Sequence, residues 1–162
     1  MSSEHRIEEI DTETCLRLLE RHHFGRVGIV DDRGPLILPV NYVLDGRAVV
    51  FRTDPGAKLL AAVEGGQACF EMDAVDEKRR FGWSVLVRGR LTQVVDEAER
   101  RRLAQRLIEP FAGGPKAYIA RIRGESISGR RIPLADDLPD EWLDKPDLGN
   151  VWRGPDASDL LG

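Results

Sequence analysis

The chain has 162 residues, of which 41% are hydrophobic and 32% charged, the balance of a soluble globular protein with one domain and a core of its own. It has no apolar run long enough to cross a bilayer, and its polar, acidic start lacks the features of a secretory signal, so we expect a cytoplasmic protein without a membrane partner. The net charge is −4, with eight acidic and two basic side chains after residue 135; the remaining +2 is far below the basic field of a nucleic-acid-binding protein, and we expect no such partner.

The first predicted element is a helix from Asp11 or Thr12 to about Arg21, because a capping side chain precedes leucines at helical spacing. His22 and His23 follow it directly. We expect the imidazoles to interact with the C-terminal end of the helix dipole, and the alternative is a metal or haem ligand. Residues 25–30 are the first predicted strand.

A hairpin is predicted next, with strands over 36–44 and 47–53. Both strands are rich in branched and aromatic residues, and Asp45-Gly46 between them tolerates the positive φ angles of a tight turn. Pro39 cannot donate a backbone hydrogen bond, so the first strand is expected to be bulged or at an edge there. Bulges often lie next to functional sites.

Polar residues end this hairpin in a way that predicts an anion site. Thr53 provides a hydroxyl, the Asp54-Pro55-Gly56 turn exposes backbone N–H groups, and Lys58 places a cation at the start of a short helix that ends at 65–66. The alternative interpretation is an ordinary capped turn with a surface lysine, because short motifs of this kind have a high false-positive rate.

The remaining elements continue the β pattern. We expect a strand over 67–73, a charged connection over 74–81, a long strand over 82–95 bent at Gly89, a helix over 96–108 and a last pair of strands within 117–132. Cys15 and Cys69, which lie in a helix and a strand pattern, are expected to be buried apolar side chains. The alternative is a reactive thiol, and the two cysteines have no metal-ligand spacing.

These elements predict a mainly β, α+β domain: an antiparallel barrel of five or six strands, closed or nearly closed, with peripheral helices. Residues 1–10 are expected to form an N-terminal arm and 11–133 the barrel. Residues 134–162 are an acidic tail whose large apolar anchors are Trp142 and Trp152. The tail is expected to lie across the domain or a partner, or to be partly disordered, and to be dispensable for folding.

Five blocks of sequence occur in the order found in one known family: GRVGIV, LPVNYVLDG, VVFRTDPGAKL, GWSVLVRGR and ISGRRI. In them the chain resembles the pyridoxamine 5'-phosphate oxidase-like flavin-binding split barrels, and within these the small bacterial branch that includes nitroimidazole-resistance-like proteins. The resemblance implies an antiparallel split β-barrel and a homodimer, with FMN in each of two clefts between the subunits.

The resemblance also assigns roles to residues. The ring of the flavin would receive backbone hydrogen bonds from Leu38, Pro39, Val40, Asn41 and Tyr42. Thr53 and Lys58 would hold the phosphate, and Arg52 would add a second cation unless the alternation of its strand points it away. The other side of the cleft would be formed by Trp83, Ser84 and Val85, although Trp83 fits a core or dimer-interface aromatic equally well.

Two departures from the family bear on activity. No histidine follows His23, so the arginine and histidine pair that grips the pyridoxal substrate in the vitamin-forming oxidases is missing, and Ala57 replaces a second basic residue. We therefore expect an FMN-dependent oxidoreductase with another small-molecule substrate. The alternatives are a reductase that uses the deazaflavin F420 and a non-enzymatic flavin- or haem-binding module.

Overall fold

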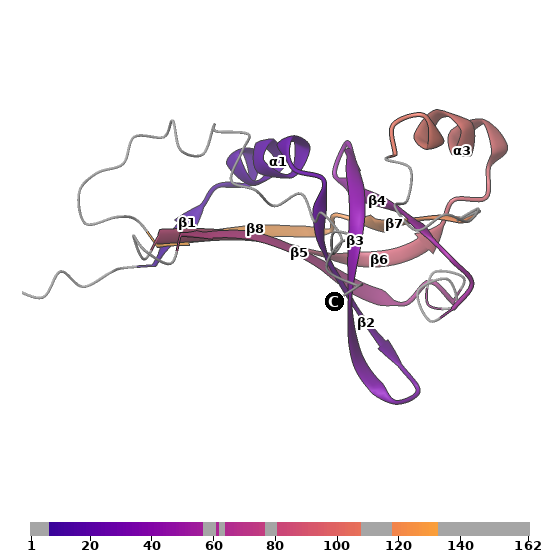
Figure 1. The fold of residues 1–162 in the computed structure, drawn as a ribbon, viewed down its shortest axis with the longest axis horizontal. Coiled ribbons are helices and arrows are strands. Elements are labelled where there is room, and N and C mark those ends of the chain that lie inside the picture. The colour runs from indigo at the N-terminus through magenta and orange to yellow at the C-terminus, as the bar shows by residue number, and fades with distance from the viewer. Residues whose placement is uncertain (1–6, 57–60, 62–63, 77–80, 108–117, 133–162) are drawn as a thin grey trace, which may run out of the picture.

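The structure is a computed structural model that describes residues 7–56, 61, 64–76, 81–107 and 118–132. In this part of the chain it contains eight strands and two helices, shown in Figure 1. In chain order they are β1 (Glu8–Ile10), α1 (Thr12–Arg21), β2 (Phe24–Asp31), β3 (Gly34–Asp45), β4 (Ala48–Thr53), β5 (Gln67–Asp76), β6 (Phe81–Gln93), α3 (Glu97–Ala104), β7 (Tyr118–Arg123) and β8 (Ser126–Ile132).

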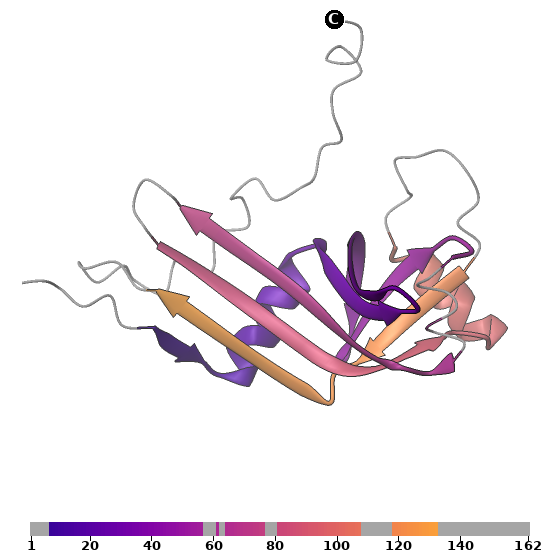
Figure 2. The same cartoon turned by 90° about the horizontal axis from the view of Figure 1, so that it is seen from below.

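The strands form an antiparallel sheet in the order β1-β8-β6-β5-β2-β3-β4-β7, and β6 also pairs with β7, which closes six of them into a barrel. β6 changes partner along its length, since residues 82–88 pair with β8 and 91–93 pair with β7. Gly89 lies at this change, where a Cβ atom would be 1.6 Å from the Arg123 carbonyl oxygen. The position predicted for a bend or bulge is thus the point where β6 leaves β8 and joins β7. Figure 2 shows β5, β6 and β8 running side by side beyond the barrel.

The predicted barrel with peripheral helices is confirmed with six strands in the ring, and β1 and β8 extend the sheet to eight strands. The arm contains β1, whose Glu8–Ile10 segment pairs with β8. The expected connection over 74–81 is also shorter, because β5 extends to Asp76 and β6 begins at Phe81. The predicted short helix after Lys58 lies largely outside the described residues, as does the acidic tail.

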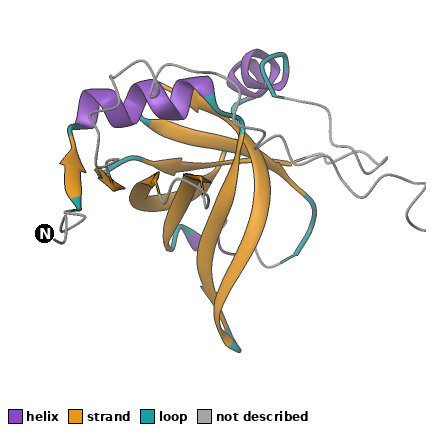
Figure 3. Ribbon diagram, turned by 60° about the vertical axis from the view of Figure 1, so that its left-hand side comes forward, coloured by secondary structure: helices purple, strands orange, loops and turns teal. Residues whose placement is uncertain are grey.

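Helix α1 forms as predicted, because Asp11 accepts a hydrogen bond from the Thr14 backbone N–H at 2.8 Å. It lies against one face of the sheet (Figure 3) and buries Leu18, Leu19 and Cys15 there. Burial raises the pKa of the Cys15 thiol to about 11, as expected for an inert buried cysteine. Cys69 differs from expectation, since it is only half-buried.

The hairpin turns at Gly46, with a φ of +63° that favours glycine, and both its strands are confirmed. Behind it, Tyr42 and Phe70 pack edge to face at 4.6 Å, and the Tyr42 hydroxyl donates to the Leu19 carbonyl at 2.7 Å. Phe51 is fully buried in the same cluster, called here the barrel core. The strands and α1 thus share one hydrophobic core.

A second cluster lies beneath α3 and is called here the α3 cluster. It consists of Val43, Val50, Val94, Leu103, Leu107 and Ile119. Asp96 caps α3 as predicted, but the helix ends at Ala104 and not near residue 108. Arg102 and Arg106, from the end of α3 and just beyond it, both contact the Asp45 carboxylate, at 2.8 and 2.9 Å.

Among the described residues, no helix is long and apolar enough to cross a membrane.

Candidate functional site

The barrel is split on one side of β3. β3 pairs with β4 only from Tyr42 to Asp45, whereas it pairs with β2 from Gly34 to Asn41. Beyond the Tyr42–Phe51 pair, β4 continues beside β7 as far as Thr53. No described strand therefore covers the side of β3 over residues 35–41 that faces away from β2.

Backbone N–H and C=O groups alternate in direction along β3, and this alternation determines which of them point into the split. Tyr42 donates its N–H to the His23 carbonyl at 2.8 Å. Hydrogen-bonded pairs alternate along an antiparallel ladder, so Val40 and Leu38 also turn toward β2, while Pro39 and Asn41 turn away. Pro39 stands where no N–H is needed, and its position at an edge is as predicted. The carbonyls of Pro39 and Asn41 and the Asn41 N–H remain for a ligand.

Adjacent residues of β4 face opposite sides at the split. Thr53 is 1% exposed, and its hydroxyl donates to the Asp54 carbonyl at 3.1 Å. Arg52 points to α3, where it donates to the Ala104 carbonyl at 3.1 Å, and its Nε atom is buried without a hydrogen-bond partner. Of the residues predicted to hold a phosphate, these two do not converge, and Lys58 lies outside the described residues.

The predicted second wall comes from the start of β6. Trp83 is 5% and Val85 0% exposed, and both belong to the barrel core, whereas Ser84 is half-buried on the opposite face. Trp83 packs edge to face against His22 at 5.2 Å. His22 Nδ1 lies 2.7 Å from the Leu18 carbonyl, in accord with the expected role at the helix end. The described residues contain no group of three His, Cys, Asp or Glu side chains placed to hold a metal ion.

An ion-pair network that the sequence did not reveal joins β2 to β5, on the side of β3 opposite the split. Arg26, opposite Pro39 in the β2–β3 ladder, contacts Glu71 at 2.7 Å and Asp73 at 2.5 Å. Burial raises the pKa of Glu71, and the hydrogen bond from Arg26 partly offsets this effect. The only signal in the sequence was an arginine inside an otherwise apolar strand block, GRVGIV.

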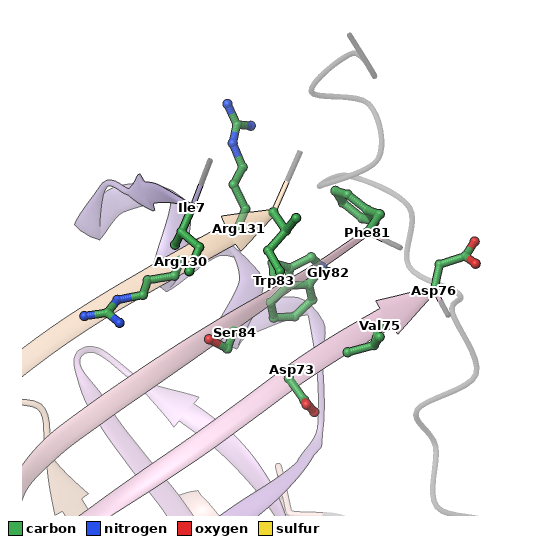
Figure 4. A pocket seen from close by; sticks show the side chains of 11 residues that line it. Ile7, Asp73, Val75, Asp76, Phe81, Gly82, Trp83, Ser84, Arg130 and Arg131 are labelled. Atoms are coloured by element: carbon green, nitrogen blue, oxygen red, sulfur yellow. The ribbon is translucent and has the colours of Figure 1, made fainter. Parts of the chain in front are cut away.

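A second feature missed at the level of sequence is a pocket of about 600 Å³ at the free end of the β1-β8-β6-β5 region (Figure 4). Its lining includes Trp83 and Ser84 from the predicted site, together with Ile7, Asp73, Val75, Asp76, Phe81, Gly82, Arg130, Arg131 and Ile132. Strand alternation in β8 would have placed Arg130 and Ile132 on one face, but their neighbours come from strands far apart in the chain.

Comparison with known proteins decides the family. A model of the pyridoxamine 5'-phosphate oxidase family matches residues 11–131. The chain belongs to this family. An uncharacterized protein of Mycobacterium tuberculosis is 37% identical over 139 residues, which are 82% of this chain and 90% of that protein.

Solved structures of similar proteins have the same fold as this chain. A FAD binding protein from Mycobacterium smegmatis is 34% identical and has a TM-score of 0.63, with 76% of this chain and 96% of that chain covered. A conserved protein of unknown function from Corynebacterium diphtheriae is 30% identical, with a TM-score of 0.66 and coverages of 78% and 98%. The split barrel is thus the architecture of this chain, as the sequence blocks implied.

Proposed function

We propose that this member of the pyridoxamine 5'-phosphate oxidase family binds a flavin nucleotide along the uncovered edge of β3, as a homodimer, and acts as an oxidoreductase on a small molecule. The observation that carries the proposal is the split itself: β3 offers backbone groups of Pro39 and Asn41 that no described strand uses. An isoalloxazine ring has acceptors and a donor along one edge, so such a strand edge can bind it as it would bind another strand.

FAD is the favoured flavin, in place of the FMN expected from sequence, because the 34%-identical Mycobacterium smegmatis protein is described as FAD-binding. The residues fit the ring better than they fit a phosphate. Thr53 ends β4 at the split, but its hydroxyl is engaged by Asp54, so any phosphate contact depends on the turn after it and on Lys58. When bound, the flavin supplies the redox chemistry.

The protein's own residues would position and shield the ring. Pro39 and Asn41 would orient it through backbone groups, and the branched side chains of Leu36 and Val40 hold that strand against the barrel core. The Arg26, Glu71 and Asp73 network lies on the other side of β3, across β2 and β5, and has one more acidic than basic group. A second subunit would complete the cleft, because in this chain one side of the β3 edge has no covering strand among the described residues.

The test is a titration of the purified, ligand-free protein with FAD, FMN, riboflavin and F420. Calorimetry and the change in the visible spectrum measure the affinity for each. We expect binding of FAD, with weaker binding of riboflavin because the latter lacks phosphate. Sedimentation should show a dimer. Absence of binding of any flavin, or a folded monomer that binds flavin fully, would contradict the proposal.

A lysine substitution tests the phosphate contact separately. Loss of one charge-assisted hydrogen bond costs about 1.5 to 3 kcal/mol, so Lys58→Ala should weaken binding of FAD and FMN by roughly 10- to 150-fold. Riboflavin binding should not change. Lys78→Ala is the matched control and should leave all affinities as in the wild type. Equal losses for FAD and riboflavin would remove Lys58 from the phosphate site.

A further inference from the structure

Another pocket lies between α3 and the β4–β7 ladder, away from the split. It has a volume of about 230 Å³ and is lined by Arg52, Ile119, Glu97, Arg100, Arg101 and Ala104. Arg52 and Ile119 are direct neighbours across β4 and β7, and they form one wall. The other four residues follow one another along α3 at three- and four-residue spacing, so they share one face of the helix and form the opposite wall.

Arg52 brings into this pocket a half-buried positive charge that has no carboxylate partner among the described residues. Its guanidinium donates to the Ala104 carbonyl at 3.1 Å, and its Nε atom is buried without a hydrogen-bond partner. The carboxylate that lines the pocket, that of Glu97, is paired with Arg101. Arginines are seldom buried without a paired charge, and an unsatisfied buried donor lowers stability. Arg52 is therefore suited to an anionic ligand.

The other charges of the pocket favour the same class of ligand. Arg52, Arg100 and Arg101 against Glu97 leave an excess of two positive charges. The side chains of Arg101 and Glu97 are 75% and 73% exposed, so their ion pair contributes little and can give way to a ligand. A guanidinium presents its donors in a planar fork that matches the oxygens of a phosphate group. A phosphoryl group is thus the chemistry that these arginines recognise best.

The size and the walls of the pocket limit what the phosphoryl group carries. Sites that bury drug-sized molecules have volumes of about 300 to 1,000 Å³, and this pocket is smaller. A flavin or a nucleotide is therefore too large. Ile119 and Ala104 make part of the wall apolar, which suits a short organic substituent.

We propose that this pocket binds a small phosphate monoester, whose phosphoryl oxygens contact Arg52, Arg100 and Arg101 and whose organic group packs against Ile119. Such a ligand would join α3 to β4 and thereby stabilise the folded chain. The site is separate from the proposed flavin edge, since Arg52 and Thr53 face opposite sides of β4. The proposal does not depend on the flavin.

The experiment titrates the full chain, with and without saturating FAD, with inorganic phosphate and with methyl phosphate. Sodium chloride keeps the ionic strength constant, and calorimetry and thermal unfolding follow binding. We expect saturable binding of both anions and a rise in the unfolding temperature. Arg52→Gln should weaken binding by roughly 10-fold or more, the effect of one lost charge-assisted hydrogen bond. Arg100→Gln, at an exposed position, should weaken it by about two- to five-fold.

Arg88→Gln is the matched control, because Arg88 is exposed on β6 and lies outside the pocket. It should bind phosphate as the wild type does, and so should Lys58→Ala in the presence of FAD. Phosphate that stabilises the protein no more than chloride would overturn the proposal. Equal losses in Arg52→Gln and Arg88→Gln would also overturn it, because they indicate general screening, and so would rejection of methyl phosphate.

A further outcome separates this site from the flavin site. If FAD abolished phosphate binding and Arg52→Gln did not, phosphate would occupy the flavin site and the proposal would be wrong. Phosphate binding that depends on Arg52 in a protein that binds no FAD would support this site, and it would contradict the flavin proposal alone.

Discussion

The barrel core and the α3 cluster are enclosed in different ways. Around the barrel core, strand pairing closes a ring, and α1 covers one side with Leu18, Leu19 and Cys15. At the α3 cluster, charged side chains hold the helix to the strands. Arg52 bonds to the Ala104 carbonyl, Arg121 pairs with Glu99, and Arg102 and Arg106 share Asp45.

The proposed flavin edge is therefore supported by the barrel core and not by the charged contacts around α3. β3 takes part in both clusters, but the strand that carries the uncovered edge is held by the barrel core through Leu36, Val40 and Tyr42. Apolar packing and a closed sheet relax little when ligands, salt or pH change. The charged rim of α3 is expected to respond to both salt and pH.

The largest effect should come from opening the ring. Gly89→Ala places a Cβ atom 1.6 Å from the Arg123 carbonyl oxygen at the end of β7. Either β6 or the end of β7 must then move to relieve the clash. The cost should exceed the ~1 to 3 kcal/mol of ordinary overpacking, and little folded protein is expected by circular dichroism. Gly66→Ala, with its nearest atom at 3.9 Å, is the control and should fold. A Gly89→Ala protein with wild-type stability would show that the ring is not closed there.

Two fully buried leucines compare the clusters directly. Leu19→Ala in the barrel core should cost about 3 kcal/mol and Leu103→Ala in the α3 cluster about 2 kcal/mol, because a helix held by side-chain contacts can shift into the cavity more easily than strands of a closed ring. Urea unfolding of both variants measures the difference. A larger loss for Leu103→Ala would contradict the idea that the α3 cluster is the more adaptable one.

Substitution of Arg52 separates the two faces of β4. Arg52→Ala should lower the free energy of unfolding by about 1.5 kcal/mol through the lost charged hydrogen bond to α3. Flavin affinity should remain as in the wild type, since the side chain points away from the split. Thr53→Ala is the companion variant. It removes the hydrogen bond to the Asp54 carbonyl at the start of the turn, and through the turn it should weaken binding of the phosphate-bearing flavins. A strong loss of FAD affinity in Arg52→Ala would show that Arg52 contacts the phosphate after all, as the sequence predicted.

The smallest effect concerns Asp45. Hydrogen bonds from Arg102, with a further contribution from Arg106, hold the pKa of this carboxyl below its ordinary value of 3.8. The folded state therefore binds this proton less readily, and the stabilisation is present above the unfolded pKa and lost as pH falls below 3.8. Asp45→Asn should cost about 1 kcal/mol or less at neutral pH.

The difference between wild type and Asp45→Asn should shrink in high salt and disappear in acid. Unfolding curves at neutral pH and near pH 3, with and without salt, measure it. A difference that persists unchanged in acid would mean that hydrogen-bond geometry, and not charge, joins α3 to the hairpin.

Much of the local structure was predictable because its causes are local. The Asp11 cap, the Asp45-Gly46 turn, the Asp96 cap and the bend at Gly89 each depend on residues within a few positions of one another, and the structure contains all four. The order of five sequence blocks was enough to identify the family and its fold. Pro39 correctly marked an edge, since a missing donor is a property of the residue itself.

Other features depended on contacts between distant parts of the chain. β1 has three residues and no apolar pattern of its own, and it is a strand only because β8 offers an edge. Arg52 and Thr53 were both candidates for one phosphate, and only the position of α3 decided that Arg52 turns to the other face. The Asp45 carboxylate belonged to a turn in the sequence and became the attachment point of a helix more than fifty residues later.

The sequence by itself thus determined most of the elements, the family and the edge position of Pro39 in β3, because caps, turns and strand periodicity are short-range effects. Only the tertiary structure decided which strand pairs with each end of β3 and β6 and which way each side chain points at the split. It also decided the pocket at the free end of β5, β6 and β8, where Val75, Gly82 and Ile132 form one row across the strands. Those features arise from register across strands that are far apart in sequence, and a one-residue change in register would reverse every side chain in the row.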